Sequence, residues 1–428
     1  MLARRVLGLV GAIAILAADC TPAARHALRV PAQVQVAVGQ EQGLVLDLPG
    51  SLAVRASSPG RLTLDGAPLG HAWSRVSAAR LLLRPDLPGT VTLQLRLFGF
   101  LPWRTLRVEA VPSTVVAVGG QSVAVAVRSR APLVVGVGGL GPPGLGNGPA
   151  GRAGVHRGDY ILAANGQDVP TPSALARAVQ AAGDAGVPLR LLLLRGGRER
   201  TVTLRPERVD GRFLIGCWVR NSATGIGTLT FQGAGRFAAL GHPVVDVTTG
   251  VPMLLGEGQL LPSQIAGIRP SRDGHPGEKL GTLIPGGAPL GIVLKNTAVG
   301  VFGRLVTAGG SMAPELPIAL EDQVHIGPAE ILTVVHGTTV EAYGVRIDAV
   351  LPQRLPTSKG LVLTVTDPRL LRATGGIVQG MSGSPIIQQG RLVGAVTHVL
   401  VDNPERGYGV LALWMAQAAG LVPVANEE

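Results

Sequence analysis

Short runs of alternating apolar and polar residues, each ended by glycine or proline, occur along most of this chain. Residues 33–38 read Gln-Val-Gln-Val-Ala-Val and residues 44–48 read Leu-Val-Leu-Asp-Leu, with Pro-Gly pairs at 49–50 and 59–60. Alternation with a period of two is typical of strands, and the 61 glycines and 33 prolines disfavour long helices. We therefore predict a mainly β protein that begins with a β-rich module over residues 28–127. This module is expected to be a small β-sandwich or similar fold without catalytic residues.

The composition permits several hydrophobic cores. Of the 428 residues, 46% are hydrophobic and 15% are charged, which excludes a disordered chain and indicates two or three domains. The formal net charge of +11 comes almost entirely from arginine, since lysine occurs only at Lys279, Lys295 and Lys359. The arginines are scattered singly and aromatic residues make up only 3% of the chain, so we expect no nucleic-acid partner. Attraction to anionic lipid headgroups stays open.

The N-terminus has the pattern of an export signal. Arg4 and Arg5 precede an uninterrupted apolar stretch at residues 6–18, which is shorter than the roughly 20 residues of a membrane-spanning helix. We predict that residues 1–27 form a signal peptide or a short signal anchor. The rest of the chain is then extracytoplasmic, either exported or membrane-anchored. The residues before Cys20 match a lipoprotein site poorly.

No cofactor or metal is expected. The second cysteine, Cys217, stands alone between apolar residues, which makes a structural disulfide improbable. No group of cysteines or histidines has the spacing of metal ligands.

A different pattern covers residues 128–208. Residues 149–166 contain Ala-Gly, Gly-Asp, Ile-Leu and Asn-Gly pairs, and a helical pattern at 173–182 and a strand pattern at 189–194 follow. The Asn-Gly pair is a two-residue hairpin signal, and Asp159 of the Gly-Asp pair is expected to cap a turn. The string resembles a PDZ domain.

The resemblance to a PDZ domain implies a peptide groove. Such grooves bind an extended chain end as an added strand, and backbone N–H groups of the preceding loop hold its carboxylate. Here that loop falls near residues 133–138, so Leu133, Val134, Val135 and Gly136 are the predicted peptide-binding residues. A PDZ fold that only docks against neighbouring domains stays open as the alternative.

The strongest chemical signal is a serine between glycines near the C-terminus. Residues 380–385 read Gly-Met-Ser-Gly-Ser-Pro between two apolar runs. Gly380 and Gly383 allow backbone conformations closed to other residues, so the N–H groups of Gly380 and Ser382 can point into one pocket and hold an oxyanion. A serine hydroxyl also needs an imidazole to take its proton, and His242 lies far upstream in an Ala-Leu-Gly-His-Pro segment. The pair predicts a serine peptidase.

The order of the two residues favours the chymotrypsin arrangement, in which histidine precedes serine. Residues 209–428 are enough for a two-barrel peptidase domain. A nucleophile elbow is excluded because it needs glycine two residues after the serine, where this chain has Ser384. Ser384 is a rival nucleophile, but Pro385 follows it. We interpret His398, within an apolar strand pattern, as a core histidine, and a simple tight turn remains the alternative for the serine motif itself.

Further segments are similar to one known family nearly end to end. These are residues 97–102, 111–112, 119–123, 223–231, 239–242, 276–281, 374–385, 394–399 and 403–409. Together with the PDZ string they closely resemble the stage IV sporulation protein B (SpoIVB) serine peptidase family, peptidase family S55, of endospore-forming bacteria.

This resemblance implies a secreted or membrane-tethered serine endopeptidase with a chymotrypsin-like double β-barrel. Such an enzyme acts in the space between the mother cell and forespore membranes. There it cleaves a membrane-bound regulatory protein, which releases an intramembrane protease and activates a late sigma factor; it also cleaves itself. The family's nucleophile falls on Ser382, its general base on His242 and its acid on Asp367. Asp246 is a rival acid, which we interpret as a solvated turn residue.

Two other functions remain open. One is a non-catalytic scaffold that binds a partner's extracytoplasmic tail through the PDZ groove. The other is a quality-control protease, but those enzymes place the peptidase before the PDZ domain. Autoprocessing, if it occurs, is expected within residues 18–32 or in the first β module, because proteolysis favours loosely ordered chain.

Overall fold

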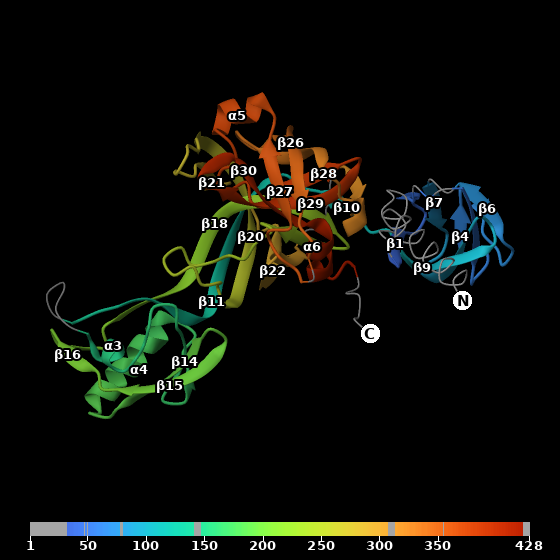
Figure 1. The fold of residues 1–428 in the computed structure, drawn as a ribbon. Helices are drawn as coiled ribbons and strands as arrows, with labels where there is room; N and C mark the ends of the chain where they lie inside the picture. Colours follow the sequence, from blue (N-terminus) through green and yellow to red (C-terminus); the bar gives the residue numbers. More distant parts are fainter. Residues whose placement is uncertain are drawn as a thin grey trace, which may run out of the picture. The chain divides into compact units, whose positions relative to one another are not determined.

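The computed structural model describes residues 32–422, apart from 47, 49, 78–79, 141–146, 307–312 and 354. Its contacts divide the chain into two compact units, residues 1–114 with 320–323 and residues 115–319 with 324–428. Figure 1 shows the fold with its elements labelled. The predicted signal segment 1–27, with Cys20, lies outside the described residues. No helix in the described part of the chain is long and apolar enough to span a membrane.

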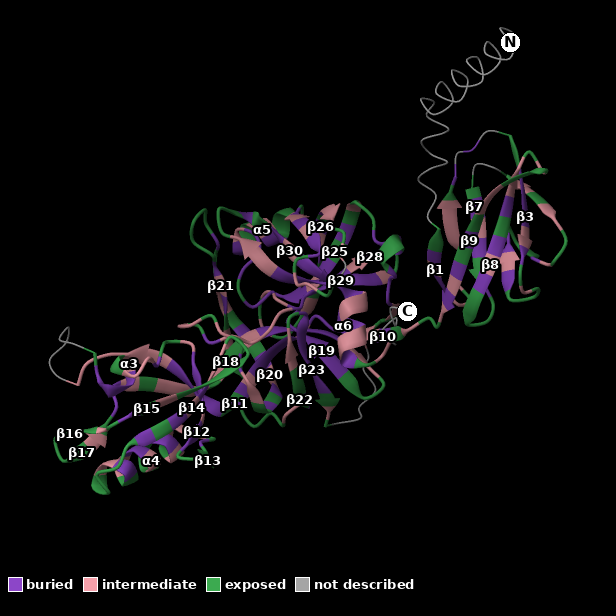
Figure 2. Ribbon diagram, turned by 60° about the horizontal axis from the view of Figure 1, so that its bottom comes forward, coloured by how far each residue is buried: buried purple, intermediate pink, exposed green. Residues whose placement is uncertain are grey.

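The first unit is a β-sandwich. One sheet has the strand order β1-β9-β8-β3-β6 and the other β2-β7-β4-β5. Leu52 and Leu93 of the first sheet share one buried cluster with Leu62 and Leu83 of the second. Buried residues alternate with exposed ones along β8 and β9 (Figure 2), as expected for sheets with one face on a core. The predicted β-rich N-terminal module is confirmed.

The strands of this unit are β1 (Gln33–Ala37), β2 (Gln42–Val45), β3 (Ser51–Ala56), β4 (Leu62–Leu64), β5 (Ala67–Pro68), β6 (Ser74–Ser77), β7 (Arg80–Pro85), β8 (Gly89–Leu97) and β9 (Leu101–Val111).

The second unit contains the predicted PDZ fold. Thr171 caps its main helix by accepting a hydrogen bond from the Ala174 N–H at 3.2 Å, and Leu175 and Val179 face its core. The predicted hairpin turn is present at Asn165 and Gly166, both with positive φ. The elements are α3 (Pro149–Arg152), β12 (Tyr160–Ala164), β13 (Gln167–Asp168), α4 (Pro172–Asp184), β14 (Leu189–Arg195), β15 (Arg198–Leu204), β16 (Glu207–Val209) and β17 (Arg212–Leu214).

Six strands of the same unit form a closed ring, the first barrel. Each pairs with the next in the order β11-β20-β22-β23-β19-β18, and β18 pairs again with β11. Leu229, Phe237 and Leu260 are buried inside it. The ring strands and their attached strands are β10 (Val115–Val118), β11 (Ser122–Val137), β18 (Cys217–Gly233), β19 (Arg236–Ala239), β20 (Leu255–Arg269), β21 (Glu278–Leu283), β22 (Gly291–Thr297), β23 (Gly300–Leu305) and β24 (Glu315–Pro317).

A second closed barrel follows with the order β25-β26-β27-β30-β29-β28. Ile331, Leu363 and Ile386 fill its core. The two rings confirm the predicted double β-barrel. The remaining elements are η1 (Glu321–Gln323), β25 (Gly327–Val334), β26 (Val340–Val350), β27 (Leu361–Val365), α5 (Pro368–Thr374), β28 (Pro385–Gln388), β29 (Arg391–Leu400), β30 (Asn403–Leu411) and α6 (Ala412–Ala419).

Two long strands belong to both the PDZ fold and the first barrel. β11 pairs with β20 in the barrel through its first half, and its Leu133 pairs with Tyr160 of the PDZ strand β12. β18 follows β11 along both halves. The predicted boundary between residues 127 and 128 therefore falls inside β11, where the chain passes between the two folds without a linker.

Candidate active site

The loop that carries Ser382 is held by hydrogen bonds to its carbonyl groups. It joins α5 to β28, and five successive carbonyls, those of residues 379–383, each accept a hydrogen bond. The donors, in order, are Lys279 N at 2.9 Å, Thr228 Oγ1 at 3.0 Å, Ser384 N at 2.9 Å, Thr228 N at 2.8 Å and Thr230 Oγ1 at 2.8 Å. Three of the five donors lie on β18, so the nucleophile loop of the second barrel is fixed against a strand of the first.

This arrangement leaves two N–H groups of the loop unused. The amides of residues 379, 381, 383 and 384 donate to backbone carbonyls. No hydrogen bond among the described residues uses the N–H of Gly380 or Ser382. These are the two amides that the sequence predicts for the oxyanion hole, and their freedom is what binding an oxyanion requires.

Gly383 is required by a close approach of two backbones. Its φ is +93°, and a Cβ atom there would lie 2.1 Å from the Thr228 carbonyl oxygen and 2.5 Å from the Leu240 nitrogen. Neither backbone atom can move away cheaply, because both belong to the first barrel. The glycine after the serine therefore sets how closely the two barrels approach at the site.

His242 comes from the first barrel, in the loop after β19. Its Nδ1 lies 2.8 Å from the carbonyl oxygen of Pro243, which can only accept, so Nδ1 carries the hydrogen and Nε2 keeps its lone pair. Burial lowers the pKa of His242 below its ordinary value, against the effect of the Pro243 hydrogen bond. The imidazole is therefore neutral at neutral pH, as a general base must be.

His242 and Ser382 line the same cavity, of about 610 Å³. The Ser382 hydroxyl donates to the Thr397 carbonyl oxygen at 2.8 Å. No hydrogen bond joins it to His242 among the described residues, so the hydroxyl must rotate away from Thr397 before the imidazole can take its proton. Catalytic hydrogen bonds often tighten only when substrate binds.

Asp367 has a structural role in the described contacts. It caps α5 by accepting from the Arg369 N–H at 2.8 Å, and its other oxygen pairs with the Arg369 guanidinium at 2.8 Å. That guanidinium holds the pKa of Asp367 well below its usual range. Asp367 does not line the cavity and makes no hydrogen bond to His242 in the described structure. Its assignment as the triad acid stays a prediction.

Asp246 is a buried residue, so the interpretation of it as a solvated turn residue is wrong. It is 1% exposed, lines the cavity and pairs with Arg220 at 2.6 Å. Its other oxygen accepts hydrogen bonds from the N–H groups of Thr248 and Thr249. Burial opposes ionisation, but the Thr249 amide and the Arg220 guanidinium outweigh it and lower the pKa of Asp246. Its partner Arg220 lies 26 residues earlier, on β18, so no local pattern could indicate the pair.

His398 lies beside His242, with 5.2 Å between the ring centroids. It follows Thr397 on β29, and its Nδ1 is buried without a hydrogen-bond partner. Burial, together with the nearby His242 and Lys359, lowers the pKa of His398 to about 4. The sequence placed His398 in the core, whereas the fold places its ring against the candidate base.

Comparisons with known proteins bear on this site directly. Residues 211–416 match the model of the SpoIVB peptidase S55 family. The match covers just under half of the chain, and the matched segment, residues 211–416, is called the S55 domain here. Residues 146–195 match a PDZ domain. The S55 match begins just before β17, includes the strands of both barrels except β11, and contains both His242 and Ser382.

Solved structures give a weaker likeness. The active form of the Rv3671c protease from M. tuberculosis is 14% identical, covers 48% of this chain and 77% of its own, and has a TM-score of 0.28. Its inactive form is 15% identical, covers 46% of this chain and 85% of its own, and has a TM-score of 0.26. At these TM-scores the likeness supports no conclusion. No curated protein matches the chain.

A buried lysine lies under the nucleophile loop of the S55 domain. Lys279 is 5% exposed, its stem packs against Gly380, and its ammonium donates to Thr333 Oγ1 at 2.7 Å. Thr333 Oγ1 also accepts from Ser384 Oγ at 2.9 Å. Burial lowers the pKa of Lys279 to about 7. In the sequence this lysine stands out only as one of three, because a side chain's burial depends on which strands surround it.

Ser384 is not accessible to a substrate. Its side chain is fully buried, and its hydroxyl donates to Thr333. In the S55 domain it supports the nucleophile loop from below, which removes the geometric basis for a rival nucleophile.

The PDZ groove lies elsewhere than the sequence predicted. Leu133 and Val134 are fully buried between strands, and the Trp218 ring covers Gly136. Neither these residues nor Val135 line the apolar groove of about 270 Å³ on this fold. Its walls are residues 139–140, 172, 175–176, 179 and 213–219. These residues do not line this groove because β18, not β11, forms the strand that faces α4, and their role in peptide binding stays a prediction.

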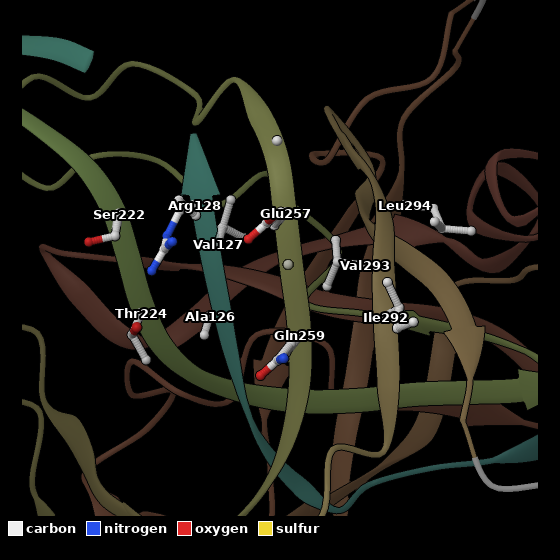
Figure 3. A pocket seen from close by; sticks show the side chains of 12 residues that line it. Ala126, Val127, Arg128, Ser222, Thr224, Glu257, Gln259, Ile292, Val293 and Leu294 are labelled. Atoms are coloured by element: carbon white, nitrogen blue, oxygen red, sulfur yellow. The ribbon is translucent and has the colours of Figure 1, made fainter. Parts of the chain in front are cut away.

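A further hollow of about 590 Å³ lies on the outer face of the first barrel (Figure 3). Side chains from four strands line it, among them Arg128, Glu257 and Ile292. They come from β11, β20 and β22, and β18 contributes Ser222 and Thr224. This hollow is a surface feature of the sheet and contains neither His242 nor Ser382.

Proposed function

We propose that this protein is a serine endopeptidase in which Ser382 is the nucleophile and His242 the general base. The observation that carries the proposal is that His242 and Ser382, from different barrels, line one cavity next to two unused N–H groups. The S55 family match supports it.

The chemistry follows from these groups. Ser382 Oγ forms a bond to the scissile carbonyl carbon while His242 Nε2 takes its proton. The carbonyl π electrons move to the oxygen, and the N–H groups of Gly380 and Ser382 bind the resulting oxyanion. His242 then gives the proton to the leaving amine as the C–N bond breaks. Water, deprotonated by His242, releases the acyl group and restores Ser382.

The role of Asp367 needs its own measurement. The D367N variant keeps a side chain that caps helices as well as aspartate does and loses only the charge pair with the largely exposed Arg369, so its stability should fall by no more than about 1 kcal/mol. If Asp367 is the triad acid, as the family resemblance implies, kcat falls by about 10⁴ because the imidazole loses its orientation and charge partner. A variant that remains within a few fold of the wild type excludes that role and leaves Asp367 as a helix cap.

The biological role is proposed from the family. We place the enzyme outside the cytoplasm, exported or anchored by residues 1–27, in the space between mother cell and forespore membranes. Its substrates are a membrane-bound regulatory protein and the enzyme itself. The cleavage triggers intramembrane proteolysis and late sigma-factor activation.

Intact mass spectrometry and active-site labelling test the peptidase. The wild type and the S382A and H242A variants are incubated for hours, and each is treated with diisopropyl fluorophosphate. We expect fragments and a labelled Ser382 only in the wild type. If all three stay intact and unlabelled, and none cuts a candidate partner's tail, the chain is instead a scaffold that binds through the PDZ groove.

A further inference from the structure

One edge of β18 has no partner strand over its first half. Residues 217–228 pair with β11 on one side. On the other side, pairing with β19 begins only at Leu229. Within the described part of the chain, no strand covers the second edge between Cys217 and Gly227. A free edge presents a row of N–H and C=O groups to which another extended chain can pair.

The same edge lines both the PDZ groove and the catalytic cavity. Of the residues of β18, 217–219 line the groove, and Arg220 with residues 222–226 lines the cavity. Successive side chains of a strand point to opposite faces of the sheet. Consecutive residues can therefore all line the same hollow only where that hollow runs along the edge of the strand. The groove and the cavity are therefore consecutive stretches of one open edge.

β18 also connects this edge to the nucleophile. The Thr228 N–H donates to the Ser382 carbonyl oxygen at 2.8 Å, and Thr228 lies two residues beyond Ile226, the last residue of β18 that lines the cavity. A chain paired along the edge thus runs directly to Ser382.

We infer that a substrate segment binds in extended form as an added strand on β18, with an apolar side chain in the PDZ groove and its scissile bond at Ser382. The inference rests on the proposed peptidase function and specifies how that site selects its substrate. β18 pairs antiparallel with both β11 and β19, so the added strand continues the sheet best if it is also antiparallel. The groove residue then lies on the C-terminal side of the cut.

The strand fixes the spacing between the two recognition points. Eight residues separate Trp218 in the groove from Ile226 in the cavity, which corresponds to about 27 Å of extended chain. The substrate therefore has its groove residue about eight positions after the scissile bond.

The groove also indicates the chemistry of that residue. Leu175 and Val179 of α4 form one wall, and Val219 of β18, which packs on the same apolar cluster, forms part of the other. None of the groove-lining residues is charged. A large aliphatic or aromatic side chain fits such a site, and a charged one does not.

A peptide-library digestion tests the inference. The probe is a bacterial proteome cut into peptides by a glutamate-specific protease, and the new ends made by the full-length wild type are mapped by mass spectrometry. We expect few cuts with fewer than about eight residues after the cleaved bond. We also expect enrichment of apolar residues near the eighth position. Both follow from the strand rise.

Three variants complete the test. V219A shortens a side chain of the β18 wall of the groove, and A176E places a charge at an exposed groove position of α4 while keeping a good helix former. Both should lose the enrichment and cut at least about 10-fold fewer peptides, a loss typical of removing one buried apolar anchor. I292A is the matched control, since Ile292 is an exposed apolar residue on the other hollow of the barrel (Figure 3), and it should behave as the wild type.

Each outcome decides the matter. The inference is overturned if the wild type shows no preference for an apolar residue at a fixed distance from the cut. It is also overturned if the apolar residues are enriched on the N-terminal side of the cut, or if only I292A loses the preference. Labelling of Ser382 by diisopropyl fluorophosphate is measured in the same samples. A labelled, active enzyme without the spacing rule refutes this inference alone, whereas absence of both cutting and labelling refutes the peptidase proposal.

Discussion

Replacing Lys279 with methionine should stabilise the S55 domain, by an amount that depends on pH. Lys279 is buried with only a hydroxyl as its hydrogen-bond partner, and its pKa falls from the model-peptide value of 10.5 to about 7. A lowered pKa means that the unfolded chain binds the proton more tightly than the folded one. The resulting loss of folding stability is fully present below about pH 7. It disappears as the pH rises to the pKa of the lysine in the unfolded chain.

The magnitude follows from the shift. A difference of 3.5 between 10.5 and 7 corresponds to about 5 kcal/mol. K279M keeps the stem that packs on Gly380, while Thr333 Oγ1 keeps its hydrogen bond from Ser384. Losing the lysine hydrogen bond costs about 1 to 2 kcal/mol. The net gain at pH 6 is then about 3 to 4 kcal/mol, and at pH 10.5 the variant is no more stable than the wild type.

Urea unfolding between pH 6 and 10.5 measures this difference, in an S382A background that prevents self-cleavage. Hydrogen exchange of β25 and β28 peptides identifies the transition of the S55 domain. Parallel curves for the two proteins across this pH range would refute the reasoning. They would mean that Lys279 is either solvated or paired with an anion.

Three further predictions concern the same domain. The acid limb of kcat/KM, or of the labelling rate against pH, should have its midpoint below the ordinary histidine pKa, because burial keeps His242 neutral; a midpoint above it contradicts the assigned burial. G383A should lose about 3 kcal/mol or more of unfolding free energy in urea titrations, because its Cβ would meet the Thr228 carbonyl. G390A is the control: its φ is also positive, +71°, but its Cβ would meet open space, so it should lose only about 1 to 2 kcal/mol. D246N should lower the free energy of unfolding by about 2 kcal/mol, since it breaks the ion pair with the partly solvated Arg220. It should also expose the 246–250 loop to proteolysis. Equal cleavage rates of variant and wild type would exclude that the ion pair holds this loop.

Local sequence patterns predicted much of this protein. Period-two alternation and the Gly-Pro punctuation indicated strands, and both the sandwich and the two barrels are present. The Asn165-Gly166 turn needs only its neighbours in the chain, so it was readable directly. Turn glycines around Ser382 also predicted which two amides remain unused.

The remaining features needed long-range pairing. Asp246 is buried because Arg220 of another strand neutralises it, and Lys279 is buried because Thr333 and Gly380 meet it from distant segments. The residues that line the PDZ groove could not be read from the sequence, because it does not show that β18 supplies the strand facing α4. In each case the partner residues lie tens of positions away or more.

The sequence by itself determined the strand-rich composition of the chain, its PDZ and S55 segments and the two candidate catalytic residues, because each depends on local spacing and residue type. Only the tertiary structure decided that β11 and β18 belong to both folds and that the groove and the cavity share one edge. Strand pairing is set by the closure of the barrel as a whole. No local pattern records which strand becomes the neighbour of which.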